Sequence, residues 1–255
     1  MVGVGSARLK GRVGIVTGGA AGIGRAVAER LREEEATVVI GDIDAQTGKE
    51  TARQLGADFV HADMSSPSDV RAMFSWVSTQ KGRLDVLVNN AGGAPEPYFP
   101  QAPFEHWSKT VSLNLIGPML AIQLAIPLMS ANGGGTIVNI SSIAGLGWGG
   151  YEAPEYAAPK AGLVRLTSAL TPLEESARIR THCICPDWVD TPSSRRSRQK
   201  LSEEELRKLP RILDPAEVAE VILRLTLDGG PNGSIVVLRG GIPPRILPRT
   251  DWKSL

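Results

Sequence analysis

The sequence predicts an α/β fold, in which helices cover both faces of a doubly wound, seven-stranded parallel sheet. Short runs rich in β-branched residues, such as Val13–Val16 and Thr37–Ile40, alternate with stretches of helical periodicity. A glycine-rich turn, Thr17–Gly24, joins the first of these runs to the first helical stretch. The 255 residues suffice for one such domain, and no stretch has the composition of a linker. We therefore expect a single domain over residues 1–255.

The composition favours a soluble globular protein that binds neither nucleic acid nor membrane surfaces. Hydrophobic residues make up 42% of the chain and charged residues 22%, and the formal net charge is +1. Cys183 and Cys185 lie two apart on a predicted strand, so they share a face and are not expected to bond to each other. Because the N-terminus also lacks the apolar core of a signal peptide, we expect a cytoplasmic location.

The most apolar helical stretch is Val111–Met129. It carries Asn114, Gln123, Pro118 and Pro127. These residues favour a packed or interface helix over a membrane span, because a spanning segment is predominantly apolar.

Strands and helices alternate through the first half of the chain. The predicted elements are a helix over Arg25–Glu35, strands over Thr37–Ile40 and Phe59–His61, a helix over Asp69–Lys81 with its N-cap within Ser65–Ser68, and a strand over Leu84–Val88. The motif glycines of the turn, Gly18, Gly22 and Gly24, lie between a strand and a helix. Backbone N–H groups at a helix start can bind a phosphate there, so the turn predicts a dinucleotide site.

The second strand ends at Gly41-Asp42. An acid at this place accepts hydrogen bonds from the adenosine ribose hydroxyls and repels a ribose phosphate, which favours NAD over NADP. Arg25 is a weak argument for NADP, because it follows the last glycine and does not lie beside the end of the second strand. An alternative interpretation is that Asp42 or Asp44 only caps the next helix.

The fourth strand runs into Asn89-Asn90-Ala91-Gly92, whose small residues permit a cofactor to approach the backbone. The predicted elements that follow are a Pro-rich loop over Ala94–Pro103, a long helix containing Asn114, a strand over Gly135–Ser142, a helix beginning near Pro154 or Glu155, strands over Ile179–Cys185 and Ile235–Leu238, and a helix over Ala216–Leu225.

Tyr156 and Lys160 are spaced i, i+4 and therefore share one face of a helix. The pKa of a free tyrosine is about 10, and a nearby ammonium lowers it, so we expect Tyr156 to act as a general acid and base. Tyr151 is a second phenol, but its i+4 partner Glu155 would raise its pKa. Strand alternation points Ser141 away from the face of Ser142, and Ser142 is favoured as the catalytic serine.

Taken in order, TGGAAGIG, Asp42, NNAG, Asn114, Ser142 and YAAPK resemble the short-chain dehydrogenase/reductase family over about residues 10–240. The resemblance implies a Rossmann-type fold and hydride transfer between NAD(P) and a secondary alcohol or ketone. It implies that Ser142 bonds the substrate oxygen and Tyr156 exchanges a proton with it. Lys160 would tune Tyr156 and bind the nicotinamide ribose, and the Asn114 main chain would hold a proton-relay water. The alternative for Asn114 is a buried side chain that bonds its own helix.

The resemblance also implies a set of cofactor contacts. They are Thr17, Gly18, Gly22, Ile23 and Gly24 in the glycine turn, Asp42 and Ile43 after the second strand, Asp63 and Met64 at the adenine, Asn90, Ala91 and Gly92 after the fourth strand, Tyr156 and Lys160, and Pro186, Val189 and Thr191 at the carboxamide and phosphates.

Three residues depart from the family pattern. Pro159 and Pro172 fall in the predicted catalytic helix, where proline is tolerated only in the first turn. We therefore expect the helix to begin close to Pro154 or Glu155, or to bend there, and to kink at Pro172. Asp187 stands where the family has glycine and is a candidate to reach the mouth of the site.

Residues 193–212 correspond to the family's mobile, substrate-covering segment. Its cations are candidates to recognise an acidic substrate: Arg195, Arg196, Arg198 and Lys200. The alternative is a solvated charged face, which the acids Glu203–Glu205 favour. Leu146, Trp148 and Trp188 indicate either an apolar substrate pocket or core packing. The Pro-rich tail, residues 242–255, is expected to pack on a neighbouring subunit or to fray.

The resemblance further implies a homotetramer or homodimer, built on the apolar helix near Asn114 and the helix after Tyr156. The three histidines show no ligand spacing, so no metal site is predicted. The leading hypothesis is an NAD-preferring oxidoreductase with a small alcohol or ketone substrate. The alternatives are an NADP-preferring reductase of the same family and a non-catalytic, dinucleotide-sensing protein.

Overall fold

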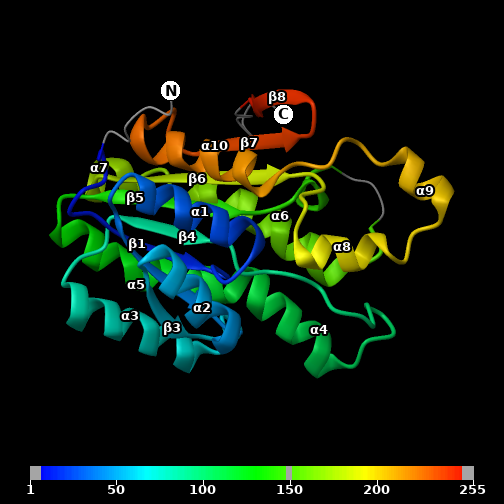
Figure 1. Cartoon of the computed structure of the whole chain (residues 1–255), viewed down its shortest axis with the longest axis horizontal. Coiled ribbons are helices and arrows are strands. Elements are labelled where there is room, and N and C mark those ends of the chain that lie inside the picture. Colours follow the sequence, from blue (N-terminus) through cyan, green and yellow to red (C-terminus); the bar gives the residue numbers. More distant parts are fainter. Residues whose placement is uncertain (1–6, 148–150, 249–255) are drawn as a thin grey trace.

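Eight strands form the sheet of the computed structural model, which describes residues 7–147 and 151–248 (Figure 1). The strands are β1 (Val13–Thr17), β2 (Thr37–Asp42), β3 (Asp58–His61), β4 (Val86–Asn89), β5 (Gly135–Ile140), β6 (Ile179–Pro186), β7 (Ser234–Arg239) and β8 (Ile242–Ile246). Their spatial order is β3-β2-β1-β4-β5-β6-β7-β8. The first seven are parallel, so the predicted doubly wound sheet is confirmed.

The eighth strand is an addition to the predicted seven. β8 pairs antiparallel with β7 and lies within the tail that was expected to fray or to pack on another subunit. Fraying is wrong for Ile242–Ile246, because the chain turns back and pairs with the open edge of β7, whereas packing on another subunit stays a prediction. Pro243 and Pro244 are compatible with an edge strand, which needs no outward N–H donors. The tail residues 249–255 lie outside the described residues.

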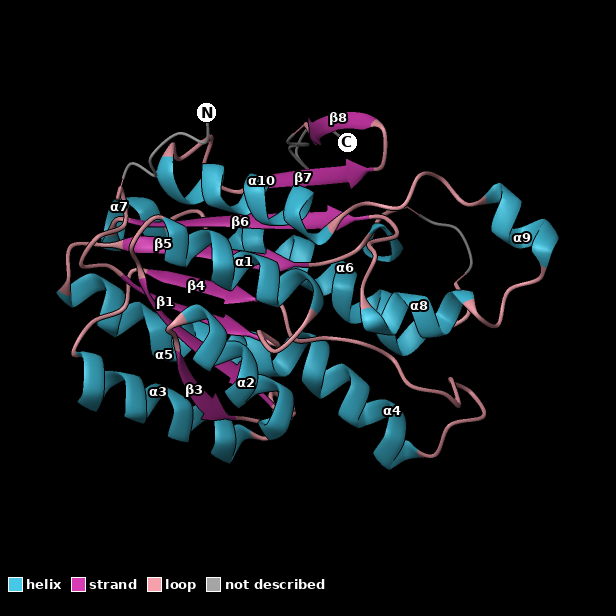
Figure 2. Cartoon of the chain, in the orientation of Figure 1, coloured by secondary structure: helices cyan, strands magenta, loops and turns pink. Residues whose placement is uncertain are grey.

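Helices cover both faces of the sheet (Figure 2). The helices are α1 (Gly22–Glu33), α2 (Ala45–Leu55), α3 (Pro67–Lys81), α4 (Phe104–Val111), a π-helical turn η1 (Ser112–Ile116), α5 (Gly117–Ala131), a 3₁₀ turn η2 (Ile143–Gly145), α6 (Pro154–Ala169), α7 (Leu173–Ala177), α8 (Pro192–Arg198), α9 (Glu203–Lys208) and α10 (Pro215–Leu227). Buried side chains of α1, α2 and α10 form the core on one face, and those of α3 and α5 form it on the other.

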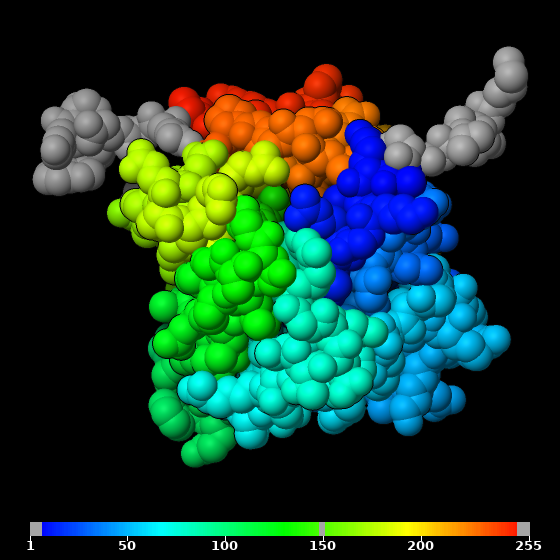
Figure 3. Space-filling view, turned by 90° about the vertical axis from the view of Figure 1, so that its left-hand side faces the viewer, coloured from blue at the N-terminus to red at the C-terminus, as the bar shows by residue number. Residues whose placement is uncertain are grey.

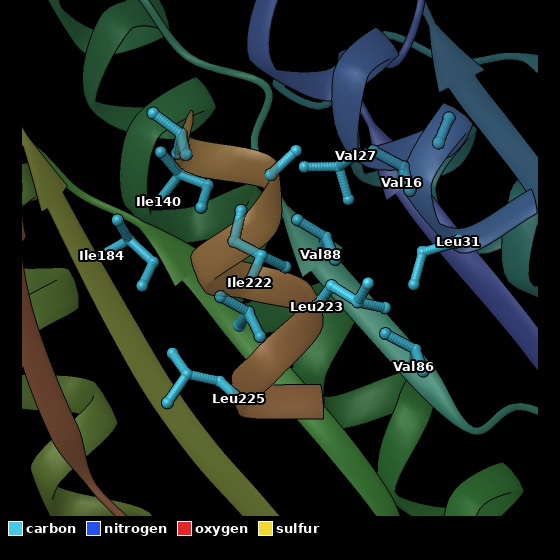
Figure 4. Close-up of a cluster of buried hydrophobic side chains, with 14 of the residues drawn as sticks. Val16, Val27, Leu31, Val86, Val88, Ile140, Ile184, Ile222, Leu223 and Leu225 are labelled. Atoms are coloured by element: carbon cyan, nitrogen blue, oxygen red, sulfur yellow. The ribbon is translucent and has the colours of Figure 1, made fainter. Parts of the chain in front are cut away.

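Strand alternation divides the core between these two faces. In β4, Val86 and Val88 pack toward α1 and α10, whereas Leu87 packs toward α3 and α5. Ile222 and Leu223 of α10 lie among these strand residues in Figure 4. Every position of β4 is buried, and Val86–Val88 form a continuous apolar run. The sequence predicts this pattern for a strand covered on both faces.

The helix that contains Asn114 is interrupted by one π-helical turn. Residues 104–131 form one 28-residue helix that is long and apolar enough to cross a membrane by length and composition alone. Ala121, Ala125 and Met129 are fully buried against the sheet, as in the predicted packed helix. The π-turn itself was not predicted from the sequence.

The catalytic-helix prediction is right at its start and wrong at its end. α6 begins at Pro154, as predicted, so Pro159 falls within its first two turns. α6 ends at Ala169, and Pro172 is the N-cap of the separate helix α7. Pro172 therefore lies between two helices and kinks neither, since proline disfavours a helical conformation in the residue before it.

Parallel pairing brings the carboxyl ends of β1, β2, β4, β5 and β6 to one edge, toward which the β6 and β7 arrowheads point in Figure 2. β1 lies between β2 and β4, so the chain winds outward from β1 in both directions. Ligands of open α/β sheets bind at this kind of switch point.

Candidate active site

The glycine turn packs directly against the loop that follows β4. Gly18 has a φ of +64°, and a Cβ placed on it would lie 2.9 Å from the Ala91 Cα. A Cβ on Gly24 would lie 2.2 Å from the Gly18 carbonyl oxygen, and one on Gly22 would lie 2.9 Å from the Thr191 Cγ2. These three positions therefore require glycine for the chain's own packing.

The N-terminus of α1 fits a dinucleotide diphosphate. Its N-cap, Ala21, provides no side-chain hydrogen bond, and the first turn contains no acidic residue. The first N–H groups of the helix are consequently left for a bound anion, which the helix dipole also favours. Ile23 is half-buried beside the turn.

Thr17 and Asn90 hold the two turns together. The Thr17 hydroxyl accepts hydrogen bonds from the Asn90 N–H (3.0 Å) and the Ala91 N–H (3.1 Å). The Asn90 side chain donates to the carbonyls of Thr17 (2.9 Å) and Gly18 (3.0 Å). This reciprocal bonding fixes the carboxyl ends of β1 and β4 at one spacing.

Asp42 ends β2 and bonds the glycine turn. Its Oδ2 accepts from the Ala20 N–H at 2.9 Å, and its Oδ1 accepts from the Asp44 N–H at 3.0 Å. Asp44, not Asp42, caps α2, through hydrogen bonds from the N–H groups of Gln46 and Thr47. A carboxylate has about four acceptor sites, so Asp42 retains capacity for a ribose hydroxyl.

The residues after β3 are bonded mainly to one another. The Asp63 carboxylate accepts from the Ser65 N–H and hydroxyl and pairs with the Lys109 ammonium at 3.1 Å. Burial alone would raise the pKa of Asp63, but the bonds from Ser65 and Lys109 outweigh burial and keep the pKa below its usual value. Met64 is buried, and its carbonyl abuts Gly117 at the start of α5. Ile43, after β2, is 58% exposed.

Asn114 lies in the π-turn, fully buried, and bonds two elements. Its Nδ2 donates to the Gly93 carbonyl and to the Thr110 carbonyl, each at 2.8 Å, and its Oδ1 accepts from the Gly93 N–H at 3.2 Å. The side chain therefore bonds its own helix, as one interpretation predicted. It also binds the loop after β4, and nothing in the sequence indicated Gly93 as its partner.

Gly92 brings Asn114 and Lys160 to the same point. A Cβ on Gly92 would lie 2.8 Å from the Asn114 Oδ1 and 2.9 Å from the Lys160 Nζ. The Lys160 ammonium donates to the Ile140 carbonyl at 2.8 Å and lies 5.4 Å from the centre of the Tyr156 ring.

The two serines after β5 have different environments. Ser141 is buried, and its hydroxyl donates to the Lys160 carbonyl at 2.7 Å. Ser142 accepts from the Ala144 N–H at 3.1 Å, and its side chain is hydrogen-bonded to the Tyr156 phenol. The structure thus brings Ser142, Tyr156, Lys160 and Asn114 into one cluster and assigns Ser141 to packing.

The pKa of Tyr156 shifts in the opposite direction to the sequence-based expectation. Burial raises it to about 12, with a further contribution from Tyr151, against a lowering by the Ser142 hydrogen bond. Burial also lowers the pKa of Lys160 to about 8. The expected stabilisation of a phenolate by Lys160 is absent from this geometry, because the ammonium bonds the Ile140 carbonyl and desolvation dominates both groups.

Tyr151 stacks on Tyr156, with ring centroids 6.2 Å apart and planes at 26°. The pKa of Tyr151 is raised, as predicted, but the causes are burial and the nearby Glu152. Glu155 is buried and accepts from the Phe99 N–H at 3.3 Å, so it ties α6 to the Pro-rich loop.

The segment after β6 differs from the expectation at Asp187. The Asp187 Oδ1 accepts from the Trp188 N–H at 2.9 Å, and the Oδ2 pairs with the Arg239 guanidinium at 3.2 Å. The side chain therefore turns toward β7, and the prediction that it reaches the mouth of the site is wrong. Pro186 ends β6, Val189 is buried, and the Thr191 hydroxyl caps α8.

The basic run of the covering segment is largely paired with acids. Arg195 and Arg198 both bond the Asp190 carboxylate, at 2.6 Å and 2.5 Å. Lys200 pairs with Glu96 of the Pro-rich loop at 2.7 Å. These pairs favour the charged-face interpretation over direct recognition of an acidic substrate. Trp148, also considered for the substrate pocket, lies outside the described residues.

The parallel sheet, the glycine turn at its switch point and the Ser-Tyr-Lys-Asn cluster define a nucleotide-binding oxidoreductase of the Rossmann-fold class. A family model described as short chain dehydrogenase matches residues 12–202. The chain belongs to the short-chain dehydrogenase/reductase family.

Two known proteins resemble this chain in sequence along almost their whole length. The 3-oxoacyl-[acyl-carrier-protein] reductase FabG of Thermotoga maritima is 31% identical over 92% of this chain and 99% of its own. The cis-4-hydroxycyclohexanecarboxylate dehydrogenase of Sinomonas cyclohexanicum is 35% identical over 90% of this chain and 96% of its own.

Solved structures also superpose on the chain. A 7α-hydroxysteroid dehydrogenase complexed with NADH and 7-oxo glycochenodeoxycholic acid has a TM-score of 0.83 at 28% identity, covering 94% of this chain and 98% of its own. The RhlG/NADP complex of Pseudomonas aeruginosa has a TM-score of 0.83 at 29% identity, covering 93% and 98%. The similar structures thus include complexes with both dinucleotides.

The buried Lys160 has a predictable effect on stability. Its pKa is about 8 in the folded chain against 10.5 unfolded, so between these values the unfolded chain binds the extra proton and stability rises with pH. Below pH 8 the buried charge destabilises the fold. We expect Lys160→Met to raise the free energy of unfolding at pH 7 by about 2 kcal/mol, net of the lost hydrogen bond to Ile140.

Denaturant unfolding at pH 7 and pH 10.5 measures this effect. The gain of Lys160→Met should largely vanish at the higher pH, where the lysine is neutral in the folded chain and half-protonated in the unfolded chain. Lys49→Met, at an exposed position of α2, is the control and should change stability little at either pH. A Lys160→Met variant that is less stable at both pH values would contradict the pKa shift.

Proposed function

We propose that the chain catalyses hydride transfer between NAD and a secondary alcohol or ketone, with Tyr156 as general acid and base. The observation that carries this proposal is the convergence of Ser142, Tyr156, Lys160 and Asn114 beside the dinucleotide turn, at the carboxyl edge of the sheet. A protein that only senses dinucleotides does not need Ser142 bonded to the Tyr156 phenol and the Lys160 ammonium near the Tyr156 ring.

Each residue of the cluster has a distinct proposed role. The Ser142 hydroxyl bonds the substrate oxygen, and the Tyr156 phenol exchanges a proton with the same oxygen. The pKa of Tyr156, about 12, keeps the phenol protonated at neutral pH, which suits proton donation during ketone reduction. Lys160 binds the nicotinamide ribose, and the Asn114 main chain in the π-turn supports proton exchange with solvent. The nicotinamide supplies the carbon that accepts or donates the hydride.

The proposed cofactor contacts are those of the glycine turn, the β2 and β3 ends, the loop after β4 and the segment after β6. Asp42 is the reason to propose NAD over NADP, because its carboxylate lies at the second-strand tip and would repel a 2′-phosphate. The 7α-hydroxysteroid dehydrogenase complex with NADH and the RhlG complex with NADP support either cofactor equally.

The cofactor preference is testable with two substitutions at Asp42. Asp42→Asn keeps an acceptor for the Ala20 N–H while removing the charge, whereas Asp42→Ala removes both. We expect both variants to weaken NAD binding relative to NADP by about tenfold or more, the size of one charge-assisted hydrogen bond. Only Asp42→Ala should also lower the melting temperature.

Titration of both dinucleotides, followed by tryptophan fluorescence, gives the binding ratio. Glu50→Gln, on the exposed face of α2, is the control for a general loss of negative charge. An unchanged NAD-to-NADP ratio in Asp42→Asn would refute the NAD assignment and favour the NADP-preferring alternative.

A cyclic or acyl secondary alcohol is the proposed substrate class. Relatives named for cis-4-hydroxycyclohexanecarboxylate, for 3-oxoacyl chains and for a 7-oxo steroid acid support it. We expect NADH formation from NAD with a member of a panel of alicyclic alcohols, sterols, sugars and hydroxyacyl esters. Tyr156→Phe should reduce kcat/KM by about 10³-fold while leaving NAD binding intact, since only proton transfer is removed.

The Tyr151→Phe variant is the matched control for the loss of a phenol near the site, and it should retain most activity. Turnover that survives Tyr156→Phe would overturn the mechanism. Tight NAD binding without turnover of any panel member would favour the dinucleotide-sensing alternative.

We also propose that the chain is a cytoplasmic homotetramer or homodimer. The outer face of the helix through Asn114 supports the assembly, because Ile116 and Met119 are 50% and 47% exposed there. Sedimentation velocity at micromolar concentration should show a species larger than a 27.1 kDa monomer. Ile116→Glu should shift it toward the monomer, and a wild-type monomer would contradict the proposal.

A further inference from the structure

A cavity lies at the amino ends of the strands, at the edge of the sheet opposite the candidate active site. Its volume is about 300 Å³. It is lined by the N-terminal segment, the starts of β4 and β5, the approach to β6 and the end of α10. Figure 3 shows the side of the molecule on which these segments meet.

The lining is rich in arginine. Four arginines line the cavity, and the acidic residue in the lining is Asp85: the arginines are Arg8, Arg12, Arg178 and Arg180. Asp85 is already saturated, because it accepts from the Val13 N–H and from the guanidinium groups of Arg12 and Arg83. Arg8 is likewise paired, with Glu34 at 3.1 Å.

Arg178 and Arg180 remain without a carboxylate partner among the described residues. Arg180 is half-buried, and its guanidinium donates to two neutral oxygens, the Thr136 hydroxyl at 3.3 Å and the Thr226 carbonyl at 3.2 Å. Arg178 is exposed at the rim of the cavity. A partly buried guanidinium with neutral acceptors alone is an incomplete arrangement, because a desolvated charge favours a counter-ion.

The field of Arg180 extends into the core. His182 lies two residues farther along β6, on the same face of the strand, and is fully buried with no hydrogen-bond partner for either ring nitrogen. Burial, followed by the Arg180 charge, lowers the pKa of His182 to about 4. The ring is therefore neutral near pH 7, and it accepts no hydrogen bond from Arg180.

We propose that this cavity binds an oxyanion of the phosphate class, with Arg178 and Arg180 as its principal cationic contacts. Guanidinium groups bond phosphate oxygens in a bidentate manner, and the two arginines lie two residues apart, Arg178 just before β6 and Arg180 within it. The cavity is at the lower end of the size range of small-molecule sites, so it accommodates the free anion or the phosphate of an ester.

The test is a titration with inorganic phosphate at constant ionic strength, in the presence of saturating NAD to block the dinucleotide turn. We expect saturable binding, observed by calorimetry. Arg178→Gln and Arg180→Gln should each raise the Kd about tenfold, the effect of one lost charge-assisted hydrogen bond. Arg71→Gln, on the exposed face of α3, is the control and should leave the Kd unchanged.

A site-specific readout accompanies the calorimetry. The chain has three histidines, of which His61 is exposed, His106 is half-buried and His182 is fully buried. Phosphate should shift the ring proton resonances of His182 and leave those of His61 and His106 in place. Arg178 is exposed, so Arg178→Gln keeps the test valid even if Arg180→Gln does not fold.

Phenyl phosphate, titrated in parallel, distinguishes the two sources of the anion. A Kd about tenfold lower than that of inorganic phosphate assigns an organic phosphate ester as the ligand, and equal values assign the free anion. Absence of saturable binding of both probes, or an equal loss in the Arg71→Gln control, would overturn the proposal.

Discussion

The buried ammonium of Lys160 is the constraint around which the candidate site is built. It needs an acceptor in a place without water, and the Ile140 carbonyl at the end of β5 supplies one. Gly92 leaves the space that the ammonium and Asn114 share, and Ser141 fixes the Lys160 main chain from β5. Gly145 packs against the same backbone, where a Cβ would lie 2.6 Å from the Lys160 carbonyl carbon. The side chain and the main chain of Lys160 thus constrain three separate segments, at Gly92, at Ile140-Ser141 and at Gly145.

The residues of the candidate site lie close to the Lys160 ammonium because the strands are parallel. The carboxyl ends of β1, β4 and β5 lie side by side, so Thr17, Asn90 and Ser142, far apart in sequence, come to one edge. The Thr17–Asn90 bonds set the separation of the first two ends, and the Asn114–Gly93 bonds set the distance from the helix to the second. Because these are buried or part-buried bonds, removing one partner leaves an unsatisfied group and costs about 1–3 kcal/mol.

The sequence predicts the sheet and most members of the site because local patterns carry them. Glycines with fixed spacing, a β-branched run ending in Asp42, and an i, i+4 pair at Tyr156 are all local signals. It does not predict β8, because pairing at an edge depends on how the chain turns after Arg239. The sequence also predicts the wrong direction for the pKa shift of Tyr156. It shows the nearby Lys160, which would lower the pKa, but it does not show the burial that raises it, because the burying residues are distant in sequence. The Asn114–Gly93 hydrogen bonds are not predicted either, because the two residues are distant in sequence.

The covering segment is bonded to the Pro-rich loop more weakly than the residues of the candidate site are bonded to one another. Lys200 pairs with Glu96 of the loop, but both side chains are more than half exposed, so the pair contributes at most about 1 kcal/mol. The same loop is bonded to α6 through the Phe99 N–H and the buried Glu155. Breaking the exposed Lys200–Glu96 pair would therefore cost little free energy. The bond between the Phe99 N–H and Glu155, by contrast, involves a buried carboxylate and joins the loop to α6 one residue before Tyr156.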